Sequence, residues 1–105
     1  MSKIHITLVG GQPAPIYHGI VATQPDKVVY IYSQDTVSIL EKLKTEIQIS
    51  SETYLLDVTE PNRIKQCAEM LAERYKEDEV TVNISSGLKS WSHWFGVVFD
   101  KYPNA

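Results

Sequence analysis

The chain has 105 residues, of which 43% are hydrophobic and 22% charged, and its formal net charge is −3. This length and composition are typical of one globular domain, and the acidic balance argues against direct binding of duplex nucleic acid, which needs a basic surface. The sequence has no run of about 18 apolar residues, so no membrane span is predicted. The first strand begins without the basic and apolar regions of a signal peptide. The single cysteine, Cys67, excludes an internal disulfide and is typical of a reducing cytoplasm, where we expect the protein.

Apolar periodicity alternates along the chain between short β-rich runs and helical patterns. The β-rich runs predict strands at residues 3–9, 27–32, 53–58 and 80–84. The first helix is predicted to begin at Pro13 or Pro15, because a proline in the first turn lacks only an N–H that would have no helical partner. Its inward side chains are expected to be Ile16, Ile20 and Val21.

The other three helices are predicted from apolar residues at helical spacing. The second helix shows this spacing at Val37, Leu40, Leu43 and Ile47. The third follows a capping Thr59 and has Pro61 in its first turn. Its apolar stripe is Ile64, Ala68, Leu71 and Tyr75. The fourth helix is predicted from about residue 89 to 101, with a buried face made of Trp91, Trp94, Phe95 and Val98.

Four strand–helix units joined by linkers of a few residues predict a parallel sheet with helices on both faces. The expected fold class is α/β, an open and mainly parallel Rossmann-like sheet with strand order 3-2-1-4. The topological switch point then falls between the first and fourth strands, and ligands bind outside the carboxyl ends of the strands at such a point. Because a four-stranded sheet leaves the fourth strand at an edge, we expect residues 1–105 to be one domain, truncated from the N-terminal part of a longer protein.

Carboxylates are distributed unevenly along the chain. Twelve of the 13 acidic residues lie between Asp26 and Glu79. Residues 1–25 contain no acidic residue, and residues 80–99 contain no acidic residue and one lysine, Lys89. Each of these two acid-free segments holds one switch-point turn, at residues 10–15 and 85–89. A Ser/Gly turn that opens a helix also directs unpaired backbone N–H groups toward a ligand. The sequence therefore predicts an anion-binding site there, with a purely structural Ser/Gly turn as the alternative.

Several common chemistries lack their motifs in this chain. Gly10-Gly11 does not have the spacing of a dinucleotide-binding loop, and the serines are not in a nucleophile elbow. The three histidines and Cys67 do not have metal-ligand spacing, so no metal or cofactor is predicted. His5 is expected to be a surface or packed structural residue. His18 and His93 are expected to face solvent or to be simply hydrogen-bonded, and Cys67 is expected to serve packing.

Two motifs resemble those of CARF domains, the CRISPR-associated Rossmann-fold sensors. The run Asn-Ile-Ser-Ser-Gly-Leu-Lys at 83–89 resembles the Asn-x-Thr-Gly-Gly-Thr-Lys signature of that family, and Leu-Val-Gly-Gly-Gln-Pro at 8–13 resembles the first ligand loop of its members with C-terminal nuclease domains. The resemblance implies that the ligand-binding residues are Gly10, Gly11, Gln12, Asn83, Ser85, Ser86, Gly87 and Lys89. Leu88 and Ser86 depart from the signature, at the positions of a threonine and a glycine, and this favours ligand binding over ligand cleavage.

The same resemblance implies a homodimer that binds cyclic tetra- or hexa-adenylate and takes part in type III CRISPR antiviral defence. A cyclic oligoadenylate carries one negative charge per nucleotide, which suits an acid-free surface, and its twofold symmetry matches a dimer that supplies each loop twice. Two alternatives remain open. One is a ring nuclease that cleaves this ligand without metal, and the other is a non-catalytic Rossmann-like interaction domain.

Overall fold

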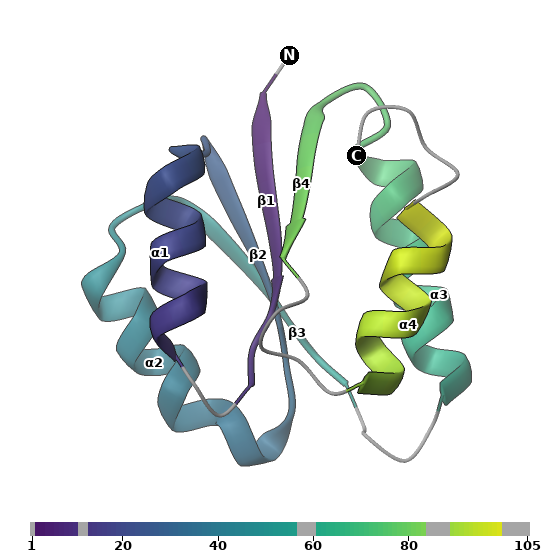
Figure 1. Ribbon diagram of the computed structural model, residues 1–105, viewed down its shortest axis with the longest axis horizontal. Coiled ribbons are helices and arrows are strands. Elements are labelled where there is room, and N and C mark those ends of the chain that lie inside the picture. Colours follow the sequence, from purple (N-terminus) through teal and green to yellow (C-terminus); the bar gives the residue numbers. More distant parts are fainter. Residues whose placement is uncertain (1, 11–12, 57–60, 84–88, 100–105) are drawn as a thin grey trace.

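The computed structural model describes residues 2–10, 13–56, 61–83 and 89–99, and of residues 13, 61 and 89–92 it describes the backbone alone. Within these ranges four strands alternate with four helices (Figure 1). In chain order the elements are β1 (Lys3–Leu8), α1 (Pro13–Thr23), β2 (Lys27–Tyr32), η1 (a 3-10 helix, Gln34–Thr36), α2 (Val37–Glu46), β3 (Ser51–Leu55), α3 (Pro61–Arg74), β4 (Glu79–Asn83) and α4 (Lys89–Phe99). No helix of the described ranges is long and apolar enough to cross a membrane.

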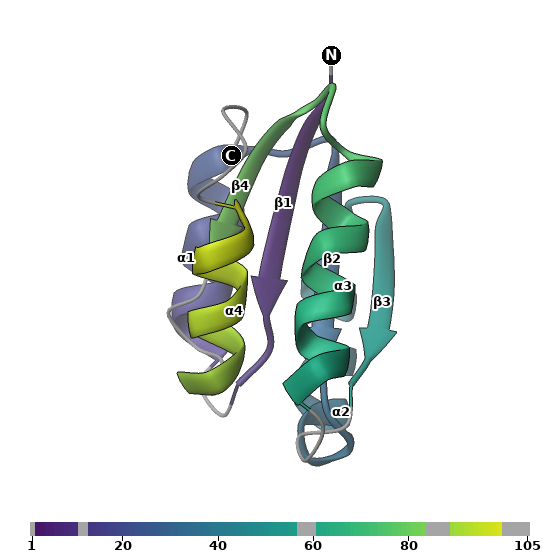
Figure 2. The same ribbon diagram turned by 90° about the vertical axis from the view of Figure 1, so that its right-hand side faces the viewer.

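The four strands form one parallel sheet in the order β3-β2-β1-β4, which confirms the predicted topology. Helices α1 and α2 cover one face of the sheet, and α3 and α4 cover the other (Figures 1 and 2). The chain moves from β1 to β2 and β3 in one direction, and then crosses back to place β4 on the other side of β1. The switch point therefore lies between β1 and β4, where a ligand site is expected.

The two faces of the sheet belong to two separate hydrophobic cores. Along β1, the side chains of Ile4, Ile6 and Leu8 pack toward α3 and α4. Val9 and, on β2, Tyr30 pack toward α1 and α2 instead. Successive strand residues point to opposite faces, and both faces are covered, so β2 is apolar along most of its length, whereas β1 also buries the polar residues His5 and Thr7.

The last helix has the predicted apolar face at the residues whose side chains are described. Phe95 and Val98 are buried in the core beneath α3 and α4, and the Phe95 ring stacks on Phe99 with 6.0 Å between centroids. Trp94 is partly buried at the edge of this core, and the Lys65 ammonium of α3 lies 5.5 Å from its ring centroid. The side chain of Trp91 lies outside the described residues.

Two details of the first and second helices differ from the prediction. Val21 was expected to face inward, but 52% of its surface is exposed. Ile16 and Ile20 are fully buried, and the next residue along a helix is rotated by about 100°, which turns Val21 toward solvent. Val37 is also exposed, because it occupies the first position of α2, before the buried stripe begins at Leu40.

The third strand begins and ends earlier than the predicted range of 53–58. It runs over Ser51–Leu55, with Ser51 opposite Val28 of β2. The polar first residues of β3 are stabilised through Glu52. Its carboxylate forms an ion pair with Lys27 and accepts a hydrogen bond from Arg74 Nη2 at 2.7 Å. Although burial opposes ionisation of Glu52, hydrogen bonds from Lys27, Tyr54 and Tyr75 lower the pKa of its carboxyl.

Candidate functional site

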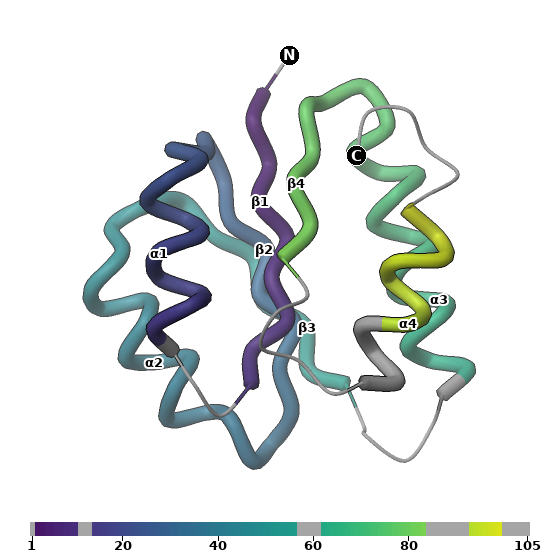
Figure 3. The backbone as a smooth tube through the Cα atoms, viewed as in Figure 1, coloured from purple at the N-terminus to yellow at the C-terminus, as the bar shows by residue number. Residues whose placement is uncertain are grey.

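The carboxyl ends of β1 and β4 meet at one edge of the sheet. Thr7 of β1 lies opposite Asn83 of β4 in the parallel register, and the two strands run side by side in every view (Figure 3). Gly10 follows β1 after Val9, and Asn83 is the last residue of β4. The structure therefore brings the two acid-free segments of the sequence together, as the predicted strand order requires.

A side-chain contact joins the two segments directly. The Asn83 amide nitrogen, Nδ2, donates a long hydrogen bond of 3.5 Å to the carbonyl of Pro15, in the first turns of α1. Gly19 lies one turn further along α1, and a Cβ atom at that position would be 2.6 Å from Asn83 Nδ2. Asn83 therefore occupies a narrow space between the end of β4 and the backbone of α1.

We call the contact surface of α1 with β1 and β4 the seam. Its part along β1 is polar and buried. His5 is 1% exposed and Thr7 0% exposed. His5 Nδ1 lies 3.0 Å from the Thr23 hydroxyl, which in turn donates to the Gly19 carbonyl at 3.1 Å. Thr23 Oγ1 carries one proton, so in the arrangement in which that proton goes to the Gly19 carbonyl, His5 Nδ1 donates to Thr23 and His5 Nε2 is an acceptor.

His5 is consequently a packed structural residue, one of the two predicted alternatives. Burial lowers the pKa of its imidazole to about 4, so the ring is neutral at physiological pH. Within the described part of the chain, neither His5 Nε2 nor Thr7 Oγ1 has a hydrogen-bond partner. A neutral ring enclosed in this way supports the position of α1 and has no exposed face for a ligand.

Of the predicted ligand-binding residues, the structure brings Gly10 and Asn83 to the same edge. Lys89 is the first residue of α4, and its backbone alone is described. Gly11, Gln12, Ser85, Ser86 and Gly87 lie outside the described residues. Their contacts with a ligand therefore stay predictions from the sequence.

The electrostatic character of this edge comes from backbone groups and from the missing acids. Both α1 and α4 begin at the carboxyl edge of the sheet (Figure 1), and neither has an acidic residue in its first turn. Helix N-termini carry partial positive charge and unpaired N–H groups, which favour anions. His18 on α1 and His93 on α4 are exposed, as predicted.

Metal and thiol chemistry find no support in the described ranges. There, no three His, Cys, Asp or Glu side chains gather in a group that could hold a metal ion. Cys67 is buried in the core, and burial raises the pKa of its thiol to about 11. The thiol is therefore protonated and unreactive at neutral pH, which agrees with its predicted packing role.

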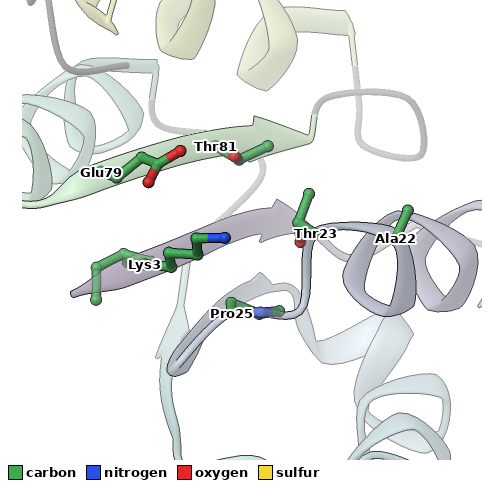
Figure 4. A pocket seen from close by; sticks show the side chains of 7 residues that line it. Lys3, Ala22, Thr23, Pro25, Glu79 and Thr81 are labelled. Atoms are coloured by element: carbon green, nitrogen blue, oxygen red, sulfur yellow. The ribbon is translucent and has the colours of Figure 1, made fainter.

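Two hollows lie elsewhere on the molecule. One, of about 240 Å³, is lined by Lys3 and Glu79 at the beginnings of β1 and β4, with Thr23, Pro25 and Thr81 (Figure 4). The other, of about 360 Å³, is largely apolar and lies between the second half of α1 and residues 46–49, at the end of α2 and just after it. Neither hollow is lined by a predicted ligand-binding residue.

Gly19, Pro15 and His5 are among the described residues of this seam that the sequence motifs did not indicate. The sequence holds one signal for them, since a glycine inside a helix often marks a close approach of another backbone or side chain. That signal does not name the partner. Asn83 is 68 residues away from Pro15 along the chain, so only the tertiary structure reveals their contact.

No protein-family model matches the chain, and no curated protein matches it. Solved structures do match. Can2 from Sulfobacillus thermosulfidooxidans, in complex with cyclic tetra-adenylate, has a TM-score of 0.85 and 10% sequence identity over 95% of this chain. Protein VC1899 from Vibrio cholerae has a TM-score of 0.81 and 21% identity over the same share.

The chain has a CARF-like fold. This CARF-like domain spans 30% of the length of Can2 and 28% of the length of VC1899. At such low identity the likeness establishes the arrangement of the elements alone. The ligand of Can2 therefore bears on this domain only as a hypothesis about its switch point.

Proposed function

We propose that this CARF-like domain binds a cyclic oligoadenylate at the edge where β1 and β4 end, as the sensor of a type III CRISPR ancillary protein. The observation that carries the proposal is the meeting of the two acid-free segments, which are joined through Asn83 and Pro15. These same segments contain the two sequence motifs that resemble CARF ligand loops. The fold shared with Can2, which was solved with cyclic tetra-adenylate, supports the choice of ligand.

The physical chemistry of the edge suits this anion. Each nucleotide of the ring brings one phosphate charge, and carboxylates near the site would repel it. Residues 1–25 and 80–99 supply no carboxylate, while Lys89 and the helix N-termini supply positive charge. In this proposal Lys89 pairs with a ligand phosphate, and the backbone N–H groups of residues 10–12 and 85–87 donate to others.

We further propose that the domain binds the ring more readily than it cuts it. Cleavage needs the ribose 2′-OH in line with the adjacent phosphorus, and a misplacement of about 1 Å can cost roughly a hundredfold in rate. Leu88 stands where the family signature has a threonine hydroxyl, and His5, which lies close to Gly19, is enclosed and neutral. The test is to incubate excess domain with labelled ring in the presence of a chelator and to follow linear products by chromatography. We expect slow, metal-independent turnover at most. Rapid multiple turnover would favour the ring-nuclease alternative.

Calorimetric titration of the domain tests the binding proposal. Cyclic tetra-adenylate and cyclic hexa-adenylate are titrated in separate experiments, with linear tetra-adenylate as the matched control of equal base composition. One ring is expected to bind at least about tenfold more tightly than the linear control, a difference of about 1.4 kcal/mol. If all three bind equally weakly or not at all, the chain is better described as an interaction domain.

A further inference from the structure

Gly19 is placed in α1 where a side chain would collide with β4. A Cβ at this position would lie 2.6 Å from Asn83 Nδ2 and 3.6 Å from His5 Cε1. Gly19 lies within a regular helix, and no glycine of the described residues has a positive φ, so the backbone conformation does not require glycine here. What requires it is the space taken by Asn83, since glycine otherwise weakens a helix interior.

The same amide is held from the side of Pro15. Asn83 Nδ2 donates to the Pro15 carbonyl, one helical turn before Gly19. The amide is planar, so an amide whose nitrogen faces α1 has its carbonyl oxygen, Oδ1, on the opposite side. The space left beside Gly19 and the hydrogen bond to Pro15 thus concern the same atom, Asn83 Nδ2, and together favour one orientation of the side chain.

From this geometry we infer that Gly19 is a positioning residue, which lets α1 approach β4 closely enough to fix the orientation in which Asn83 meets the ligand. The part that concerns the ligand rests on the proposed function. Gly19 itself touches no ligand in this account. It acts through Asn83, and it also sets the distance between the beginning of α1 and the end of β4.

The substitution Gly19→Ala separates this role from general stability. The atom that the new methyl group meets is the end of a short side chain, so the amide of Asn83 can turn away without separation of α1 from the sheet. Alanine also favours the helix more than glycine does, which offsets the loss of one long hydrogen bond. The melting temperature of the variant should therefore change little, while the amide loses its orientation.

Gly96 of α4 provides a matched control. It is also a glycine inside a helix, and a Cβ at this position would meet nothing within 4 Å. Gly96→Ala therefore makes the same chemical change without a steric consequence. Any effect of Gly19→Ala that Gly96→Ala lacks comes from the surroundings of α1.

The first readout is the side-chain amide signal of Asn83 in ¹⁵N-labelled protein without ligand. We expect Gly19→Ala to shift this signal strongly and Gly96→Ala to leave it in place. An unchanged signal in Gly19→Ala would overturn the inference, whether or not the domain binds a ring. If Gly19→Ala fails to fold, the double variant Gly19→Ala with Asn83→Ala, in which the collision is removed, should fold again; a double variant that stays unfolded would also overturn it.

The second readout is affinity for cyclic tetra-adenylate. Gly19→Ala should weaken binding by about tenfold, as expected for the loss of one hydrogen bond, and Gly96→Ala should not weaken it. In an Asn83→Ala background Gly19→Ala should have no further effect, because the residue it acts through is gone. An equal loss in both backgrounds would reveal a merely structural role. No ring binding by the unsubstituted domain would refute the proposed function, and the amide signal would still decide the role of Gly19.

Discussion

His5 makes the stability of this domain depend on pH. Its imidazole is buried, and burial lowers its pKa from 6.5 to about 4. Between these two values the unfolded chain binds a proton that the folded chain does not, so the free energy of unfolding should fall as the pH drops from about 6.5 to about 4. The total loss corresponds to about 3 kcal/mol, which urea unfolding at a series of pH values can measure.

A His5→Leu variant separates this effect from the titration of carboxylates. Glu52 also has a lowered pKa, and it loses its ion pair as the pH falls, so some acid sensitivity is expected without His5. The difference in unfolding free energy between His5→Leu and the unsubstituted protein should therefore change over the range of about pH 4 to 6.5. A difference that stays constant over this range would contradict the assignment.

Lys89 is the residue on which the proposed recognition of phosphate depends most. If its ammonium pairs with a ligand phosphate, Lys89→Ala should weaken binding of cyclic oligoadenylate by about 1–3 kcal/mol per site. The melting temperature should change little, since the lysine serves the ligand rather than the core. Titration of the variant measures the loss, and Lys44→Ala, at an exposed position in the last turn of α2, is the control for the removal of one positive charge. Normal binding by Lys89→Ala would contradict the proposal that Lys89 pairs with a ligand phosphate.

Among the elements, strands and their order follow from local sequence more closely than element boundaries do. The four β-rich runs predicted the four strands, and the four strand–helix units with short linkers predicted a parallel sheet. The expected strand order of 3-2-1-4 is confirmed. The limits of β3 were not predictable, because its polar first residues are stabilised by Lys27 and Arg74 from other elements. Helical spacing likewise predicted that Ile16 and Ile20 of α1 are buried, but it wrongly included Val21, which is exposed to solvent.

The candidate site was predictable as a location and not as a set of contacts. Charge distribution and topology both indicated the ends of β1 and β4, and the structure confirms that these ends meet. The support that Asn83 receives from Pro15 and Gly19 depends on how closely α1 packs on the sheet. Packing distance is a tertiary property. Gly19 is a local signal of a close approach, but residues 13–23 do not identify Asn83 as the partner.

The packing of α4 on the sheet offers a direct test of the fold at the level of one helix. Phe95 is fully buried and stacks on Phe99, in the core that α4 shares with α3. Phe95→Ala should therefore lower the free energy of unfolding by about 3–5 kcal/mol, through lost burial and the cavity it leaves. Val97 of the same helix is 38% exposed, and Val97→Ala should change stability much less. Equal effects of the two substitutions in chemical denaturation would contradict the observed orientation of α4.

For the whole molecule, the proposed ligand sets an expectation about assembly. A cyclic oligoadenylate with twofold symmetry presents the same groups twice, so two copies of the β1–β4 edge can face one ring. We predict a twofold homodimer that is stabilised by the ring, with one ring for two chains. Sedimentation velocity with and without cyclic tetra-adenylate measures this, and Lys89→Ala at the same concentration is the control. A monomer under both conditions, in spite of tight binding, would rule out this arrangement.

The central claim is that the ligand occupies the carboxyl edge between β1 and β4, and backbone ¹H–¹⁵N NMR during a titration with cyclic tetra-adenylate tests it most directly. The largest shifts should fall on residues 10–12, Asn83 and residues 85–89. Signals from the opposite end of the sheet, such as those of Lys3 and Glu79 beside the smaller hollow, should move little. Shifts concentrated at that opposite end, or no shifts at saturating ring concentration, would contradict the account.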